Sequence, residues 1–81
     1  MTAEKLYVGI DVSKDHLDVA VCPEADEWRT SNDQGGIQKL VSELKELRPG
    51  LVVMEATGGM ELPLAGALQL AGLPVAVVNP R

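Results

Sequence analysis

Apolar and polar residues alternate in two short segments near the start of the chain. Residues 5–11 and 16–22 each place every second residue on one face, a period that is typical of half-buried strands. The apolar positions that share this face are Leu6, Val8, Ile10, Leu17, Val19 and Val21. The polar stretch 12–15 between them suits a hairpin turn. A more polar segment, residues 27–32, follows Pro23 and predicts an edge strand, so the chain should open with a three-stranded β-meander.

The pattern changes to helical spacing after the turn-forming residues 32–36. The apolar residues at this spacing are Ile37, Leu40, Val41, Leu44 and Leu47. They predict an amphipathic helix that ends at Arg48-Pro49-Gly50. The run that follows, residues 51–54, is apolar throughout, as expected for a strand that is covered on both faces.

The last third of the chain predicts one more helix and one more strand. The helix should run from about Glu61 to Ala71, with Pro63 in its first turn, where the missing N–H costs little. Gly72 ends it, and residues 75–78 form a fifth strand. The predicted order of elements is therefore β-β-β-α-β-α-β.

This order predicts an α/β fold with one mixed sheet. A right-handed crossover through the first helix should place strand 51–55 beside strand 5–11 and parallel to it. The next crossover adds strand 75–78 beyond it. We expect five strands in the order 3-2-1-4-5.

Length and composition limit the kinds of protein that fit. The 81 residues allow one domain at most. The core must be aliphatic, because the chain has no Phe and only one Trp and one Tyr. The formal net charge of −5 argues against this segment clamping nucleic acid by itself, because non-specific affinity for phosphates comes from Lys and Arg.

Further composition features predict a cytoplasmic protein. The single cysteine, Cys22, has no partner for an intrachain disulfide or a zinc site, and we expect it to be a small buried residue. The first residues lack the apolar segment of a signal peptide. No apolar run approaches the roughly 20 residues that span a bilayer, so no membrane partner is expected.

Two acids stand where chemistry is expected in such a sheet. Asp11 and Glu55 each end an apolar strand-like run, and parallel neighbouring strands would bring both to the same edge. Two carboxylates about 4 Å apart repel by ~4 kcal/mol at an effective dielectric near 20. A divalent cation would compensate for this charge, and oxygen ligands suit Mg²⁺ or Mn²⁺. Such ions can support phosphodiester cleavage.

A purely structural role is the alternative for both acids. Asp11 would then open the hairpin turn, and Glu55 would cap the following helix or pair with a lysine. Carboxylates at strand ends are common, and two are too few for a closed metal site. The spacing alone leaves both interpretations open.

Several motifs resemble one protein family. In chain order they are Gly9-Ile10-Asp11-Val12-Ser13-Lys14, Leu17-Asp18-Val19-Ala20-Val21, Met54-Glu55-Ala56-Thr57-Gly58-Gly59 and Val77-Val78-Asn79-Pro80-Arg81. Together they resemble the amino-terminal domain of the IS110-type transposases, over essentially the whole chain. That family is similar to the RuvC-type Holliday-junction resolvase.

The resemblance implies a ribonuclease H-like fold with a four-acid DEDD site that uses Mg²⁺. By position, Asp11 would be the first catalytic and metal-binding acid and Glu55 the second. The other two aspartates of the family follow the Asn-Pro-Arg segment, whereas no aspartate follows Asp33 here. The resemblance thus predicts a truncated product or isolated domain, residues 1–81, whose metal binding is weak and which is inactive alone.

Full-length members of the family, by this resemblance, carry a further domain with a nucleophilic serine and act on DNA with a guide RNA. DNA and guide RNA are therefore expected partners only through such a longer protein. DNA recombination by transposition, with phosphodiester cleavage and strand transfer, would be the activity of that protein.

The remaining polar residues near the proposed site favour ordinary roles. We expect Asp15 in a turn, Asp18 on the side of its strand opposite Leu17, and Lys14 and His16 in solvent. Thr57-Gly58-Gly59 offers backbone N–H groups that could bind an anion at a helix start, but a tight turn is the preferred interpretation.

Two other classes of function stay open at this point. Gly9-Ile10-Asp11 before a hairpin also opens the actin-like and sugar-kinase ATPase lobes. A non-catalytic module is the third hypothesis, because strand 75–78 would leave an apolar edge that invites pairing with another chain, giving a homo-oligomer.

Overall fold

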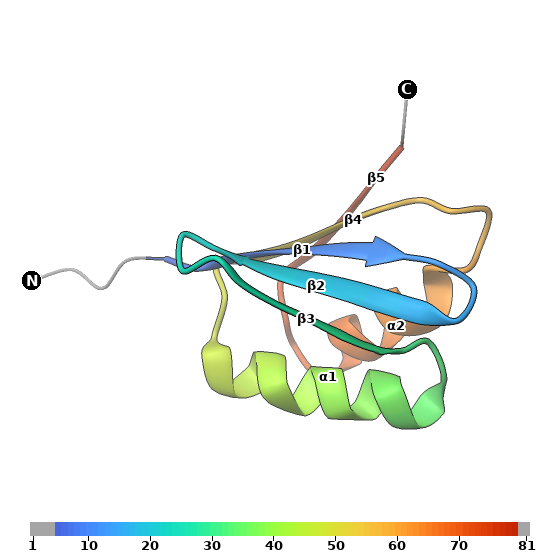
Figure 1. Cartoon of the computed structure of the whole chain (residues 1–81), viewed down its shortest axis with the longest axis horizontal. Coiled ribbons are helices and arrows are strands. Elements are labelled where there is room, and N and C mark those ends of the chain that lie inside the picture. Colours follow the sequence, from blue (N-terminus) through green and yellow to red (C-terminus); the bar gives the residue numbers. More distant parts are fainter. Residues whose placement is uncertain (1–4, 80–81) are drawn as a thin grey trace, which may run out of the picture.

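The sheet of the protein has the predicted order of strands. The computed structural model describes residues 5–79, so Met1–Glu4 and the Pro80-Arg81 part of the carboxy-terminal motif lie outside the described residues. The strands are β1 (Tyr7–Val12), β2 (His16–Cys22), β3 (Asp26–Ser31), β4 (Leu51–Glu55) and β5 (Val75–Val78). They lie in the order β3-β2-β1-β4-β5, as shown in Figure 1.

The strand directions also agree with the prediction. Strands β1, β2 and β3 form an antiparallel meander, while β4 is parallel to β1 and β5 is parallel to β4. Helix α1 (Gln34–Leu47) connects β3 to β4, and helix α2 (Leu62–Leu70) connects β4 to β5. The ribonuclease H-like α/β architecture predicted from the sequence is therefore confirmed.

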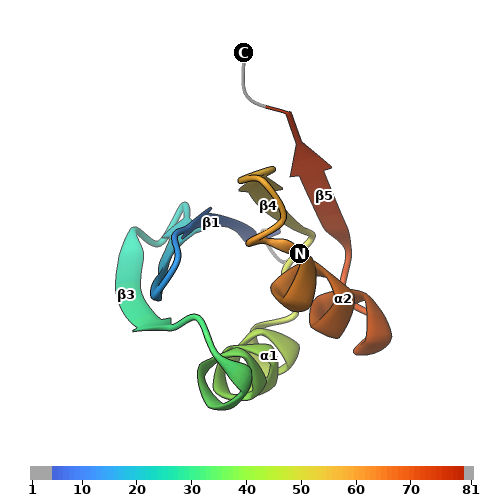
Figure 2. The same ribbon diagram turned by 90° about the vertical axis from the view of Figure 1, so that its right-hand side faces the viewer.

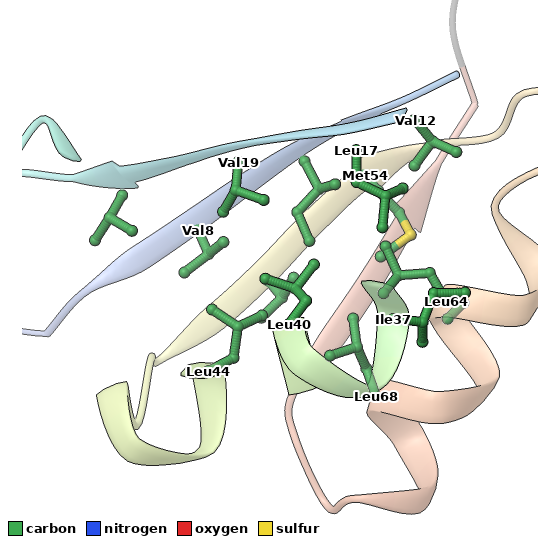
Figure 3. Close-up of a cluster of buried hydrophobic side chains, with 14 residues drawn as sticks. Val8, Val12, Leu17, Val19, Ile37, Leu40, Leu44, Met54, Leu64 and Leu68 are labelled. Atoms are coloured by element: carbon green, nitrogen blue, oxygen red, sulfur yellow. The ribbon is translucent and has the colours of Figure 1, made fainter. Parts of the chain in front are cut away.

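Both helices cover the same face of the sheet (Figure 2). The core between the helices and this covered face is aliphatic (Figure 3). Its buried members are Val8, Ile10, Val12, Leu17, Val19, Val21, Ile37, Leu40, Leu44, Val52, Met54, Leu64, Ala65 and Leu68. The alternation in β1 and β2 and the helical spacing in α1 thus supply one continuous core.

The opposite side of the sheet, here called the open face, carries no helix from residues 5–79. This corrects the prediction that strand 51–54 is covered on both faces. Only Val52 and Met54 of β4 are buried, whereas Leu51 and Val53 are half-buried on the open face. The apolar run is continuous, but both crossover helices pack on one side, so half of the run lacks a cover.

Cys22 is another correction, because it is exposed rather than buried. It pairs across the strands with Tyr7, which is also exposed. The alternation in β2 buries Val21 and turns Cys22 to the open face. Within residues 5–79 no helix is long and apolar enough to cross a membrane.

Polar residues and glycines set the ends of the helices. The Asp33 carboxylate accepts a hydrogen bond of 2.8 Å from Gly36 N and one of 2.9 Å from the Ser31 hydroxyl, which caps α1. A Cβ at Gly36 would collide with Ser31, so this position requires glycine. Helix α1 ends at Arg48 in the left-handed conformation, and Gly72, with φ of 79°, follows α2.

Candidate metal site on the open face

Asp11 and Glu55 are next to each other on the open face. Ile10 of β1 is in register with Met54 of β4, and the two acids are the next residues along these parallel strands. Because Ile10 and Met54 point into the core, the alternation turns both acids to the open face, where both are exposed. Neighbouring strands lie about 4.8 Å apart, so the two carboxylates can share one ligand.

The structure contradicts the alternative roles considered for these acids. Asp11 lies inside β1 and is not a turn residue, since Val12 still pairs with Leu17. The residue at the N-cap of α2 is Glu61 and not Glu55. Within residues 5–79, neither Asp11 nor Glu55 makes a side-chain hydrogen bond or an ion pair. The two carboxylates are therefore free to bind a cation.

A third carboxylate lies beside Asp11 but is already paired. Asp18 of β2 is directly across from Asp11 and, on its other side, across from Arg29 of β3. Arg29 Nε donates to Asp18 Oδ1 at 2.7 Å, and Nη2 donates to Oδ2 at 3.3 Å. This hydrogen bonding and the charge of Arg29 lower the pKa of Asp18 and raise the pKa of Arg29.

These residues line one hollow on the open face, with a volume of about 810 Å³. Asp11, Glu55, Asp18 and Arg29 all border it, and the small residues Gly9 and Ala20 form part of its floor. As predicted, Asp18 points away from the buried Leu17. The pairing of Asp18 with Arg29 was not predicted from the sequence.

The loop after Glu55 is held by a carboxylate that the sequence analysis did not identify. Glu61 is only 5% exposed, and its Oε1 accepts hydrogen bonds from Thr57 N at 2.9 Å, Gly59 N at 3.1 Å and the Thr57 hydroxyl at 3.2 Å. The donation from Thr57 N is the largest cause that lowers the pKa of Glu61. The sequence signal that could have identified Glu61 is its position directly before Leu62-Pro63, where the helix starts.

This arrangement supports a tight turn rather than an anion site at Thr57-Gly58-Gly59. Two of the backbone N–H groups that an anion would need already donate to Glu61. Gly58 and Gly59 have φ values of 69° and 103°, which favour glycine. The loop is thus closed around an internal carboxylate.

The turn between β1 and β2, at the same end of the sheet, is also fixed by hydrogen bonds. Asn32 Nδ2 donates to Ser13 O at 2.8 Å, and Ser13 N donates to His16 O at 2.9 Å. Lys14 and His16 are exposed and Asp15 lies in the turn, as predicted. Asn32 therefore anchors the segment that follows Asp11.

The acids fit an open magnesium site better than a closed one. No group of three His, Cys, Asp or Glu side chains in the described part of the chain is arranged to hold a metal ion. Mg²⁺ commonly takes one or two carboxylates from a protein and completes its shell with water and substrate phosphate. Asp11 and Glu55 match that donor set.

The fold is that of a ribonuclease H-like domain, and it places the two neighbouring carboxylates of Asp11 and Glu55 on adjacent parallel strands. The family model of the IS110-type DEDD transposases, described as "Transposase", matches residues 8–81. The chain belongs to this transposase family. Among curated proteins, none matches the chain.

Solved structures with the same fold include RuvC of Thermus thermophilus. In complex with a Holliday junction substrate it has a TM-score of 0.68 and 18% identity, covering 95% of this chain and 66% of RuvC. Another T. thermophilus RuvC structure has a TM-score of 0.58 and 21% identity, covering 93% of this chain and 62% of RuvC. The chain therefore spans just under two thirds of the length of RuvC.

A non-polymerising mutant of MamK bound to AMPPNP is also similar in fold. Its TM-score is 0.58 at 12% identity, covering 96% of this chain and 42% of MamK. At this identity the likeness concerns the fold alone. The ATPase-lobe alternative gains no support, because the family match assigns the chain to the transposases.

Proposed function

We propose that Asp11 and Glu55 are the first two acids of a DEDD site, and that residues 1–81 are the amino-terminal portion of a RuvC-like transposase domain. The observation that supports this proposal is the juxtaposition of two unpaired carboxylates at adjacent strand positions of the open face. Both acids fall within the residues that match the family.

A divalent ion, Mg²⁺ or Mn²⁺, would be held by these two carboxylates. A pair of such ions, when bound, would supply activation of a water or hydroxyl and stabilisation of the leaving oxygen of a phosphodiester. This chain would hold the two acids on rigid neighbouring strands. Asn32 orders the turn that follows Asp11, and Glu61 orders the loop that follows Glu55. With only two protein ligands, we expect affinity in the millimolar range.

The activity in which this site takes part is DNA cleavage and strand transfer during transposition. The two later aspartates of the family's site follow the Asn-Pro-Arg segment, and no aspartate follows Asp33 in these 81 residues. We therefore expect the 81-residue chain to lack nuclease activity by itself. Tight binding of DNA and of guide RNA would require a longer protein of the family, so these 81 residues alone should bind a single strand only weakly.

Paramagnetic broadening of backbone amide signals by Mn²⁺ tests this proposal. In the wild-type chain, broadening should centre on Asp11 and Glu55, and Asp11→Asn should abolish it. Asp26→Asn is the matched control, since Asp26 is an exposed aspartate at the opposite end of the sheet. Broadening that survives Asp11→Asn, or that Asp26→Asn removes equally, would contradict the metal role.

A further inference from the structure

The open face carries one ordered row of charges that extends beyond the two proposed metal ligands. The cross-strand pairs place Glu55, Asp11, Asp18 and Arg29 at consecutive positions across β4, β1, β2 and β3. Three carboxylates and one guanidinium leave this row with a formal charge of −2. A divalent ion at Asp11 and Glu55 would neutralise the row. Glu27, two residues before Arg29 on β3, would then be the one other carboxylate that lines the hollow within residues 5–79, so the electrostatic barrier to a phosphate is lowered.

Arg29 is the cation that the fold places in this row. Among the Lys and Arg side chains of residues 5–79, it is the one that lines the hollow containing Asp11 and Glu55. Lys39 and Lys45 lie on α1, on the other side of the sheet, and Lys14 lies in the β1–β2 turn. Positive charge at the hollow therefore comes from Arg29.

The Arg29 guanidinium is held in one orientation and still has free N–H donors. Asp18 accepts from Nε and from Nη2, which employs two of the five N–H groups of an arginine. Both Nη1 hydrogens and one Nη2 hydrogen remain available. The side chain is 61% exposed, so these donors face solvent in the hollow.

Stability alone does not explain this pair, because exposed ion pairs contribute little to folding. A guanidinium that is fixed by a carboxylate on one edge presents its free edge for bidentate contact with a phosphate, and less conformational freedom is lost on binding. If one phosphate of a polynucleotide lies at Asp11 and Glu55, the next phosphates along its backbone come within reach of the neighbouring strands β2 and β3.

We propose that Arg29 is a phosphate-binding residue of this site and that Asp18 is its positioning residue. Arg29 would contact a phosphodiester adjacent to the one held at Asp11 and Glu55, so that the polynucleotide backbone runs across β4, β1, β2 and β3. This inference rests on the proposed function, because it takes a polynucleotide as the ligand of the hollow.

Binding of a short single-stranded DNA oligonucleotide, followed by amide and arginine Nε–H NMR signals with and without Mg²⁺, tests the proposal. Arg29→Gln should weaken binding about tenfold, the loss of one charge-assisted contact. Lys39→Gln is the matched control, because it removes the same charge from the far side of the sheet and should change affinity much less. Arg29→Lys keeps the charge without the bidentate geometry and should fall between wild type and Arg29→Gln.

The Mn²⁺ broadening at Asp11 and Glu55 should persist in Arg29→Gln, which shows that the variant is folded and that its acid pair is intact. Equal losses for Arg29→Gln and Lys39→Gln would overturn the proposal, because net charge would then explain the binding. Absence of oligonucleotide binding to the wild-type chain would overturn it as well. Failure of Mn²⁺ to broaden the wild-type signals would instead count against the proposed function.

Discussion

The two faces of the sheet differ in what their side chains do. The covered face carries the aliphatic core that packs against α1 and α2, with partly buried residues such as Trp28 and Val75 on its edge strands. The open face carries a hollow bordered by four carboxylates, Asp11, Asp18, Glu27 and Glu55, and by Arg29; within residues 5–79, Asp18 and Arg29 are the ones that form an ion pair. The same strands supply both faces through alternate residues.

This difference separates the residues that make the fold from those that offer chemistry. Burial of apolar surface drives folding and is indifferent to the acids on the other side of each strand. Unpaired like charges at adjacent positions disfavour the folded state. This cost is the physical reason for the proposal that Asp11 and Glu55 bind a ligand.

The largest expected effect compares two leucines of α2. Leu68 is fully buried in the core, whereas Leu70, two residues later, is 93% exposed. Leu68→Ala should lower the free energy of unfolding by about 2–5 kcal/mol, through lost burial and a cavity. Leu70→Ala should change it by less than about 0.5 kcal/mol. Chemical denaturation of both variants checks this, and similar losses would contradict the assignment of the core.

A smaller effect on stability is expected from substitution of Glu61, whose carboxylate stabilises the loop before α2. Its pKa is lowered, chiefly because Thr57 N donates to it. The stabilisation by its charged form is therefore present above the pKa of the unfolded chain and is lost as pH falls through the lower pKa of the folded chain. Glu61→Gln should lower the melting temperature at neutral pH, and the difference from wild type should shrink on acidification.

Melting curves across this pH range measure the effect, with Glu46→Gln as the control because Glu46 is an exposed acid on α1. A difference between wild type and Glu61→Gln that stays constant with pH would refute the role of the charged carboxylate.

The sequence predicted the elements well, because their signals are local. The strand and helix periods placed most element ends to within about one or two residues, and the handedness of crossovers predicted Asp11 beside Glu55. The start of α1 was predicted too late, because Asp33 caps the helix and Gln34, Gly35 and Gly36 belong to its first turn rather than to the preceding loop. Individual side-chain hydrogen bonds between distant segments were not predictable in this way. Arg29 meets Asp18 across 11 positions, and Asn32 meets Ser13 across 19.

The two corrections on burial have one cause. Cys22 and half of β4 lie on the open face, and a periodic pattern does not say which face of a sheet both helices will cover. Glu61 was missed because its role depends on how the loop from Thr57 to Gly59 folds back onto the start of α2.

The most direct test of the central claim is the effect of Mg²⁺ on the stability of the wild-type chain and of the Asp11→Asn, Glu55→Gln double variant. Without Mg²⁺, the double variant should be as stable as wild type or more stable by up to about 1 kcal/mol, because a like-charge pair is removed. At free Mg²⁺ ten times its dissociation constant, wild type should gain about 1.4 kcal/mol relative to NaCl of equal ionic strength. The double variant should gain nothing, and an equal gain in both proteins would contradict a metal site at Asp11 and Glu55.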